Sequence, residues 1–358
     1  MAQDTDKTGT MAAERAEKIT AILQRRTHAR HEARILDLLR DLSEIEFCAV
    51  LAGVNLKRLV AALDDRLWGP DSRKEFLRLA QPKLHGLGLV TKAAFIHALV
   101  PRSNQLASEK AIVELLTSER GQRLTDLKLL VDSATDGWDL LRIIYDFITS
   151  ADLRFDLLKH FERAVEAEAS PKLRVVSDID DTIYSSLNDQ RFRRGTVYPG
   201  VMELLSALSP LPPVFLTARP ELVASLFERV THRQLASYGI ERCTVLSGSL
   251  PGLLGHRRMA EQKARTLRSY RELYPEHRFL FIGDSGQGDM ALARSLLICK
   301  PPVLERALIH RLGDFQPGSK STHRSIHTFE SYSEAAALLG ELGYLTPEQV
   351  RGIEESVT

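Results

Sequence analysis

The chain has 358 residues, of which 44% are hydrophobic and 27% are charged, and its formal net charge is +1. These values are ordinary for a globular protein of about two domains. With a net charge so close to zero, no overall positive field attracts nucleic acid or an anionic membrane, which argues against nucleic acid as a partner.

The first ten residues are polar and lack the apolar stretch of a signal peptide. No apolar run in the sequence approaches the roughly 20 residues that a membrane-spanning helix needs. The three cysteines, Cys48, Cys243 and Cys299, are scattered and lack the spacing of a metal site, as expected in a reducing compartment. The sequence therefore predicts a cytoplasmic protein without a transmembrane segment, which would meet a membrane only at its surface.

The N-terminal half predicts helices. Residues 1–15 are polar, and we expect a disordered tail there. From residue 16 to 169 apolar residues recur at helical spacing, as at 35, 38, 39 and 42, and again from 124 to 131. No strand pattern or catalytic constellation occurs in this range, which we interpret as an all-helical domain of unassigned role. Its basic segment from Gln24 to Arg34 favours a solvated helix face, with contact to anionic lipid or a partner as the alternative.

From residue 170 to 358, strand and helix patterns alternate. Short apolar runs at 173–176, 214–217, 243–246, 279–282 and 307–309, with a weaker one near 326, are typical of strands. Helical patterns lie between them, for example at 201–208, and another follows at 332–342. This alternation predicts an α/β domain, with helices on both faces of a parallel sheet.

An acidic cluster follows the first of these strands. Asp178, Asp180 and Asp181 lie within four residues of one another. Like charges this close repel unless a cation or hydrogen bonds hold them. At the carboxyl end of a parallel strand, such a cluster is suited to a hard divalent metal. The simpler alternative is an acidic turn that caps the next helix.

Further polar residues follow in chain order. Thr217 ends the second strand, Lys263 lies on a helix, and Asp284 and Asp289 follow the fourth strand. Phosphoryl transfer through an aspartyl phosphate requires a set of groups of this kind. They are a carboxylate nucleophile, a second carboxylic acid two residues on, a hydroxyl, an ammonium and metal-binding acids. Taken singly, Thr217 could be a strand-end cap, Lys263 a solvated side chain and Asp289 a helix N-cap.

The segments Asp178–Thr182, Thr217, Lys263 and Gly283–Asp289 resemble the four motifs of the haloacid-dehalogenase (HAD) superfamily of phosphatases. Within it, Ser177–Ile183, Phe215–Pro220 and Gly283–Gln287 look most like the catalytic domain of actin-patch-associated, Mg²⁺-dependent phosphatidate phosphatases, relatives of lipin. The resemblance covers about residues 171 to 345. It implies a Rossmann-like HAD sheet.

The resemblance also implies a role for each matching residue. Asp178 would be the nucleophile and Asp180 the general acid and base. Thr217 and Lys263 would bind the phosphoryl group. Asp178, the backbone carbonyl of Asp180, and Asp284 would hold Mg²⁺. Thr182 and Asp289 would support the site.

The polar insert between Tyr184 and Tyr198 is short, which in this superfamily implies an open site suited to a bulky or membrane-embedded phosphate ester. Phosphatidate is the favoured substrate by resemblance. Another phosphate ester, either a polynucleotide 3′-phosphate or a small metabolite, is the alternative within enzymes. The alternative outside enzymes is a scaffold that retains a phosphatase fold for binding.

Overall fold

In the computed structural model, the residues described are 2–63, 71–100, 105–134, 136–165, 171–186, 188–217, 233–247, 256–286, 288–313 and 323–357. The chain divides into two compact units, one of residues 1–134 and 140–167 and the other of residues 135–139 and 168–358. No helix among the described residues is both long enough and apolar enough to cross a membrane.

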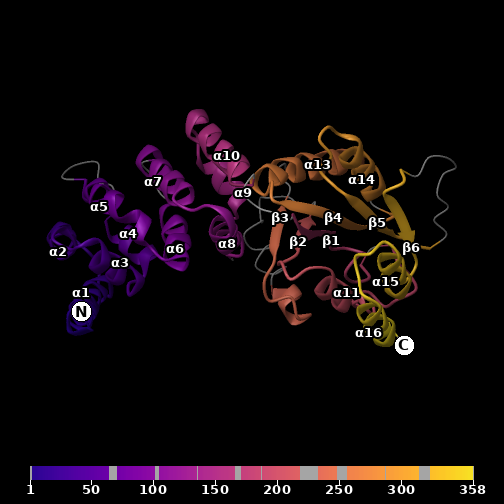
Figure 1. Cartoon of the computed structure of the whole chain (residues 1–358), viewed down its shortest axis with the longest axis horizontal. Coiled ribbons are helices and arrows are strands. Elements are labelled where there is room, and N and C mark those ends of the chain that lie inside the picture. Colours follow the sequence, from indigo (N-terminus) through magenta and orange to yellow (C-terminus); the bar gives the residue numbers. More distant parts are fainter. Residues whose placement is uncertain are drawn as a thin grey trace. The chain divides into compact units, whose positions relative to one another are not determined.

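The first unit is helical, as predicted. Side-chain oxygens cap several of its helices: Ser43, Asn55 and Asp71 each accept a hydrogen bond from the backbone N–H three residues on. Its helices are α1 (Ala2–Leu23), α2 (Ala29–Arg40), α3 (Glu44–Ala52), α4 (Leu56–Ala62), α5 (Ser72–Ala80), α6 (Leu89–Leu99), α7 (Gln105–Thr117), α8 (Gly121–Asp132), the short α9 (Leu140–Arg142) and α10 (Ala151–Val165) (Figure 1).

The N-terminus differs from the prediction of a disordered tail over residues 1–15. Helix α1 includes these residues from Ala2 onward, and Ala12, Ala16 and Ile19 form a buried stripe along it. A Cβ atom added at Gly53 would lie 3.1 Å from the Cβ of Ala16, so α1 packs closely on the end of α3. Alanines at helical spacing therefore form a buried face in a segment whose overall composition is polar.

The second unit contains a six-stranded, fully parallel sheet in the order β3-β2-β1-β4-β5-β6. Helices α13 and α14 cover one face, and α11, α15 and α16 cover the other (Figure 1). The predicted fold class is confirmed. The strands are β1 (Lys172–Asp178), β2 (Val214–Thr217), β3 (Thr244–Ser247), β4 (His277–Asp284), β5 (Arg306–His310) and β6 (Ile326–Phe329), and the helices are α11 (Val201–Leu208), α13 (His256–Leu273), α14 (Asp289–Ile298), α15 (Tyr332–Glu341) and α16 (Pro347–Val357).

Strand β1 is buried on both faces, although it contains a charged residue. Val175 and Val176 are almost fully buried, and so is Arg174, the residue before them in the strand. The guanidinium of Arg174 lies 4.4 Å from the ring centroid of Tyr274 and 5.3 Å from that of Tyr270, both on or just after α13. Cation–π stacking thus lets a central strand carry a cation and ties α13 to the sheet.

Helix α16 follows the last helix that the sequence pattern predicts. Thr346 and Gln349 form a reciprocal capping pair at its start, with Pro347 as its first residue. It packs near Gly200, the left-handed residue before α11 (φ +83°). A Cβ atom at Gly200 would lie 2.7 Å from Cγ2 of Val357, so this position needs glycine both for its backbone and for space.

We therefore expect Gly200→Ala to destabilise the protein more than Gly239→Ala. Both glycines have positive φ, but no atom lies within 4 Å of a Cβ built at Gly239. Each substitution costs about 1–2 kcal/mol for the left-handed backbone. Overpacking should add about 1–3 kcal/mol at Gly200 only. Urea denaturation measures both free energies of unfolding.

The second substitution Val357→Ala, made in the Gly200→Ala background, should recover part of the additional loss because it removes the clashing methyl groups. Equal destabilisation by Gly200→Ala and Gly239→Ala would contradict close packing of α16 against this turn.

Candidate active site

Three buried carboxylates and one buried ammonium meet at one end of the sheet. Oxygens of Asp178, Asp284 and Asp289 lie within 4.8 Å of one another. The Lys263 ammonium donates to Asp178 Oδ1 at 2.7 Å and to Asp289 Oδ1 at 2.9 Å. All four side chains are at most 7% exposed. The sequence predicted each of these residues as part of one site, and the fold brings them together.

The strand order explains this convergence. Strands β1 and β4 are neighbours at the centre of the sheet, where the order of strands reverses, and parallel strands place their carboxyl ends at the same edge. Asp178 is the last residue of β1, and Asp284 is the last of β4. Lys263 comes from α13, while Asp289 is the first residue of α14 and Gly288 takes the N-cap position. Two strands and two helices thus hold the four groups.

Burial governs the protonation of the cluster. It raises the pKa of Asp178 to about 7, with a further increase from Asp289 and an opposing effect from Lys263. It likewise raises the pKa of Asp284 to about 8, assisted by the charges of Asp289 and Asp178. Burial alone would lower the pKa of Lys263, but the carboxylates of Asp178 and Asp289 outweigh it and raise that pKa. Without a further cation, Asp178 and Asp284 therefore retain protons near neutral pH.

The donor set fits a hard divalent cation. Three carboxylates close together supply the oxygen ligands that Mg²⁺ prefers, and one ammonium leaves negative charge unbalanced once the acids ionise. Asp284 Oδ1 accepts a hydrogen bond from the backbone N–H of Gly286, whereas its buried Oδ2 has no hydrogen-bond partner among the described residues. A buried carboxylate oxygen without a donor is well suited to bind a metal.

Asp180 and Thr217 lie beside the cluster. Asp180 follows β1 by two residues, and its carboxylate accepts a hydrogen bond from Ser186 Oγ at 2.8 Å. Its side chain is not among the three acids that meet at the cluster. The register pairs Asp178 with Leu216, so Thr217 ends β2 one residue beyond the level of Asp178. The motif residues Ala218, Arg219 and Pro220, like Gln287, lie outside the described residues.

Thr182 is fully buried, and its hydroxyl has no hydrogen-bond partner within the described part of the chain. Its backbone carbonyl accepts from the Tyr332 hydroxyl at 2.5 Å, which joins the loop after β1 to α15. The backbone of Thr182 is therefore anchored to α15, and the supporting role of this residue stays a prediction.

Asp181 organises the turn after β1, a function that sequence reasoning missed. It is in the left-handed conformation (φ +57°), where a non-glycine residue is uncommon. Its carboxylate accepts from the backbone N–H groups of Ser186 and Asn188 at 2.7 and 2.8 Å. Asp181 thereby positions Ser186, which in turn holds the carboxylate of Asp180. Its short spacing from Asp178 and Asp180 gave no signal of a separate role.

A second network joins the insert to the sheet. The Arg191 guanidinium pairs with Asp189, and it also contacts Nε2 of His310 at 3.0 Å. His310 Nδ1 lies 3.1 Å from the backbone carbonyl of Asp181. A neutral imidazole with its proton on Nδ1 satisfies both contacts, and burial lowers the pKa of His310 accordingly. This network fixes the turn that carries Asp180 from the side of β5.

The comparison with protein families agrees with this geometry. Residues 173–310 match the family model of the phosphatidate phosphatase APP1, catalytic domain. The resemblance to phosphatidate phosphatases is confirmed for this segment. It includes β1 through β5 and the four residues that meet at the cluster. No curated protein and no solved structure matches the chain. The match supports a phosphatase, and the acid cluster lies inside the matched segment.

The raised pKa of Asp284 leads to a test in metal-free protein. The folded state keeps a proton on this acid up to about pH 8, whereas the unfolded chain loses it near pH 4, so its contribution to stability is lost as pH rises through that window. Asp284→Asn cannot ionise. In excess chelator we expect the variant to melt at least about 5 °C above the wild type at pH 9, with little difference at pH 5.

Circular dichroism melting curves of both proteins at the two pH values provide this comparison. A melting difference of the same size at pH 5 and pH 9 would mean that burial and the neighbouring carboxylates do not keep Asp284 protonated.

Proposed function

We propose that the α/β unit is a Mg²⁺-dependent phosphomonoesterase of the HAD type that hydrolyses phosphatidate through an aspartyl-phosphate intermediate. The observation that carries this proposal is the 2.7 Å pair between Lys263 Nζ and Asp178 Oδ1, inside an acid cluster and within the segment that matches the phosphatase family. We assign catalysis to the domain of residues 170–358 and a role in substrate presentation to the helical domain of residues 16–169.

In the first step, a carboxylate oxygen of Asp178 attacks the phosphorus atom. The bond between phosphorus and the ester oxygen breaks, and its electron pair leaves with that oxygen. Asp180, as the carboxylic acid, donates a proton to the leaving oxygen and gives an alcohol, diacylglycerol if the substrate is phosphatidate. Ser186 donates to the Asp180 carboxylate and holds it in orientation.

In the second step, Asp180, now a carboxylate, removes a proton from water, whose oxygen attacks the phosphorus atom of the phosphoaspartate. The bond between phosphorus and the Asp178 oxygen breaks, which releases inorganic phosphate and restores the Asp178 carboxylate. Lys263 and the hydroxyl of Thr217 would bind the non-bridging oxygens and offset the charge of the phosphoryl group in both steps.

Asp178, Asp284 and the backbone carbonyl of Asp180 would hold Mg²⁺, and Asp289 would support Lys263. When bound, the cation offsets the negative charge of the phosphoryl oxygens and keeps nearby carboxylates ionised at neutral pH. Asp178 would then be a carboxylate at the pH where it must attack.

Two substitutions distinguish the nucleophile from the acid. Asp178→Asn should lower turnover at least about a thousandfold on every phosphate ester, because no attacking oxygen remains. Asp180→Asn should lower turnover of an alkyl phosphate by about 10²–10⁴, but should have a much smaller effect on nitrophenyl phosphate, whose leaving group needs no proton. Steady-state kinetics on both substrates measures this contrast.

Melting curves of both variants control for folding. Substantial activity in correctly folded Asp178→Asn would identify another nucleophile. Equal losses on the two substrates in Asp180→Asn would remove the proton-transfer role from Asp180.

Removal of the metal gives an independent test. Excess chelator should abolish phosphatase activity, and Mg²⁺ should restore it, whereas Ca²⁺ should inhibit because its larger and looser coordination misplaces the nucleophile. Asp284→Asn should raise the Mg²⁺ concentration for half-maximal activity at least about tenfold. Full activity in the presence of chelator would contradict the metal assignment.

A further inference from the structure

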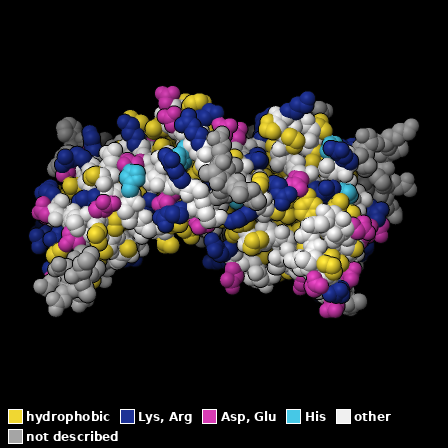
Figure 2. Space-filling view, viewed as in Figure 1, with side chains coloured by type: hydrophobic (Ala, Val, Ile, Leu, Met, Phe, Trp, Pro, Cys, Tyr) yellow, Lys and Arg dark blue, Asp and Glu magenta, His cyan; other side chains and the backbone are white. Residues whose placement is uncertain are grey.

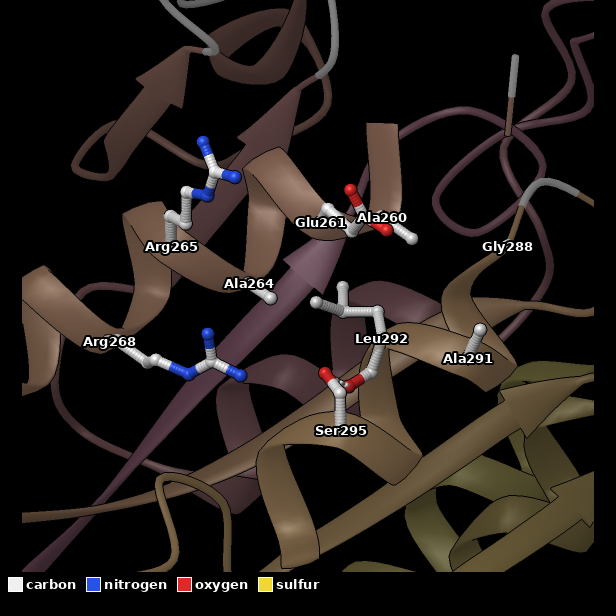
Figure 3. A pocket seen from close by; sticks show the side chains of 9 residues that line it. All are labelled: Ala260, Glu261, Ala264, Arg265, Arg268, Gly288, Ala291, Leu292 and Ser295. Carbon is white, nitrogen blue, oxygen red and sulfur yellow. Dashed lines mark hydrogen bonds between the residues drawn. The ribbon is translucent and has the colours of Figure 1, made fainter. Parts of the chain in front are cut away.

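A groove lies between α13 and α14 on the outer surface of the α/β unit. Its volume is about 590 Å³, within the range of small-molecule sites. The floor is apolar and is formed by Ala260 and Ala264 of α13 and by Leu292 of α14, with Ala291 at the edge (Figure 3). The remaining lining residues are Glu261, Arg265, Arg268, Gly288 and Ser295.

Two arginines lie on the α13 side of this apolar floor. Arg265 and Arg268 are exposed on α13, and Figure 3 shows both guanidinium groups at the α13 side of the groove. Neither has a hydrogen-bond or ion-pair partner among the residues that the structure describes. The surrounding surface is similar in character: Ile298, at the end of α14, is 68% exposed, and basic side chains border apolar ones over these helices in Figure 2.

The groove and the catalytic cluster share the same two helices. Lys263 of α13 points into the cluster, whereas its neighbours Ala264 and Arg265 line the groove. Gly288 lines the groove and directly precedes Asp289. A ligand in the groove would therefore be held on the rigid elements that position the reactive groups, but outside the acid cluster itself.

We propose that the α13–α14 groove binds one anionic phospholipid, with an acyl chain on the apolar floor and the phosphate group on Arg265 and Arg268. This lipid is additional to the one whose phosphate is hydrolysed. The inference rests on the proposed function, because a phosphatase acting on phosphatidate must work at a lipid surface. Charge complementarity favours this ligand over two others. A soluble anion would leave the apolar floor uncovered, and an apolar peptide would leave two arginines without a partner.

The test is sedimentation of the full chain with vesicles of phosphatidylcholine containing phosphatidylserine. Arg265→Gln/Arg268→Gln should weaken binding roughly 10- to 30-fold, since each basic residue contributes about a factor of five at an anionic surface. The control Arg242→Gln/Arg351→Gln removes the same charge from exposed positions elsewhere on the unit and should bind within about twofold of the wild type.

A second variant separates groove occupancy from surface charge. Ala291→Trp adds bulk to the edge of the groove and leaves the charge unchanged, so it should weaken vesicle binding by at least about fivefold. Soluble glycerol phosphate should not compete with the vesicles, because it lacks the acyl chain. Unchanged binding by the arginine pair variant, or by Ala291→Trp with an intact melting curve, would overturn the proposal, as would equal weakening by the control pair.

Hydrolysis of nitrophenyl phosphate by the wild-type chain is measured in parallel. If the wild-type chain hydrolyses nitrophenyl phosphate but the groove substitutions leave vesicle binding unchanged, this inference is refuted and the proposed function is not. If the groove substitutions weaken vesicle binding but the wild-type chain hydrolyses no phosphate ester, the proposed function is refuted and this inference is not.

Discussion

The structure of the site depends on the balance between three buried carboxylates and the single ammonium of Lys263. Asp178, Asp284 and Asp289 would repel one another strongly if all were ionised in so small and dry a space. Lys263 offsets part of this charge by pairing with Asp178 and Asp289. The remainder is relieved by protons that Asp178 and Asp284 retain, or it would be relieved by a divalent cation. The repulsion among the carboxylates destabilises the metal-free fold. Relief of the same repulsion would favour the binding of a divalent cation.

The elements around the cluster keep this balance in place. Arg174 stacks on Tyr270 and Tyr274 and thereby ties α13 to the sheet. This contact holds the helix that carries Lys263 against β1. On the other side, Asp181 and His310 hold the turn that bears Asp180. Asp180, the proposed acid and base, is thus positioned by a hydrogen bond from the insert, whereas Asp178 and Asp284 are positioned by the ends of β1 and β4. The groove for which we propose a lipid ligand is lined by α13 and α14, which belong to the same frame.

Sequence patterns predicted the parallel sheet and the meeting of Asp178, Lys263, Asp284 and Asp289, because strand ends and their order along the chain restrict where such residues can lie. They could not predict the roles of Asp181, Ser186 and His310, since these depend on hydrogen bonds across a turn and between distant strands. Helix α16 could have been predicted from the Thr346–Gln349 capping pair. The helical course of residues 2–15 could not be predicted from composition, because alanines at helical spacing bury a face only when a partner helix lies beside them.

The central claim is that Asp178 is phosphorylated during turnover. The most direct measurement is mass spectrometry of the peptide containing Asp178, after the wild-type protein is mixed with short-chain phosphatidate and Mg²⁺ and quenched in acid within the first turnover. We expect an added phosphoryl group on Asp178 that forms before inorganic phosphate is released and disappears as the substrate is exhausted. Release of phosphate in the first turnover with Asp178 unmodified throughout would contradict it.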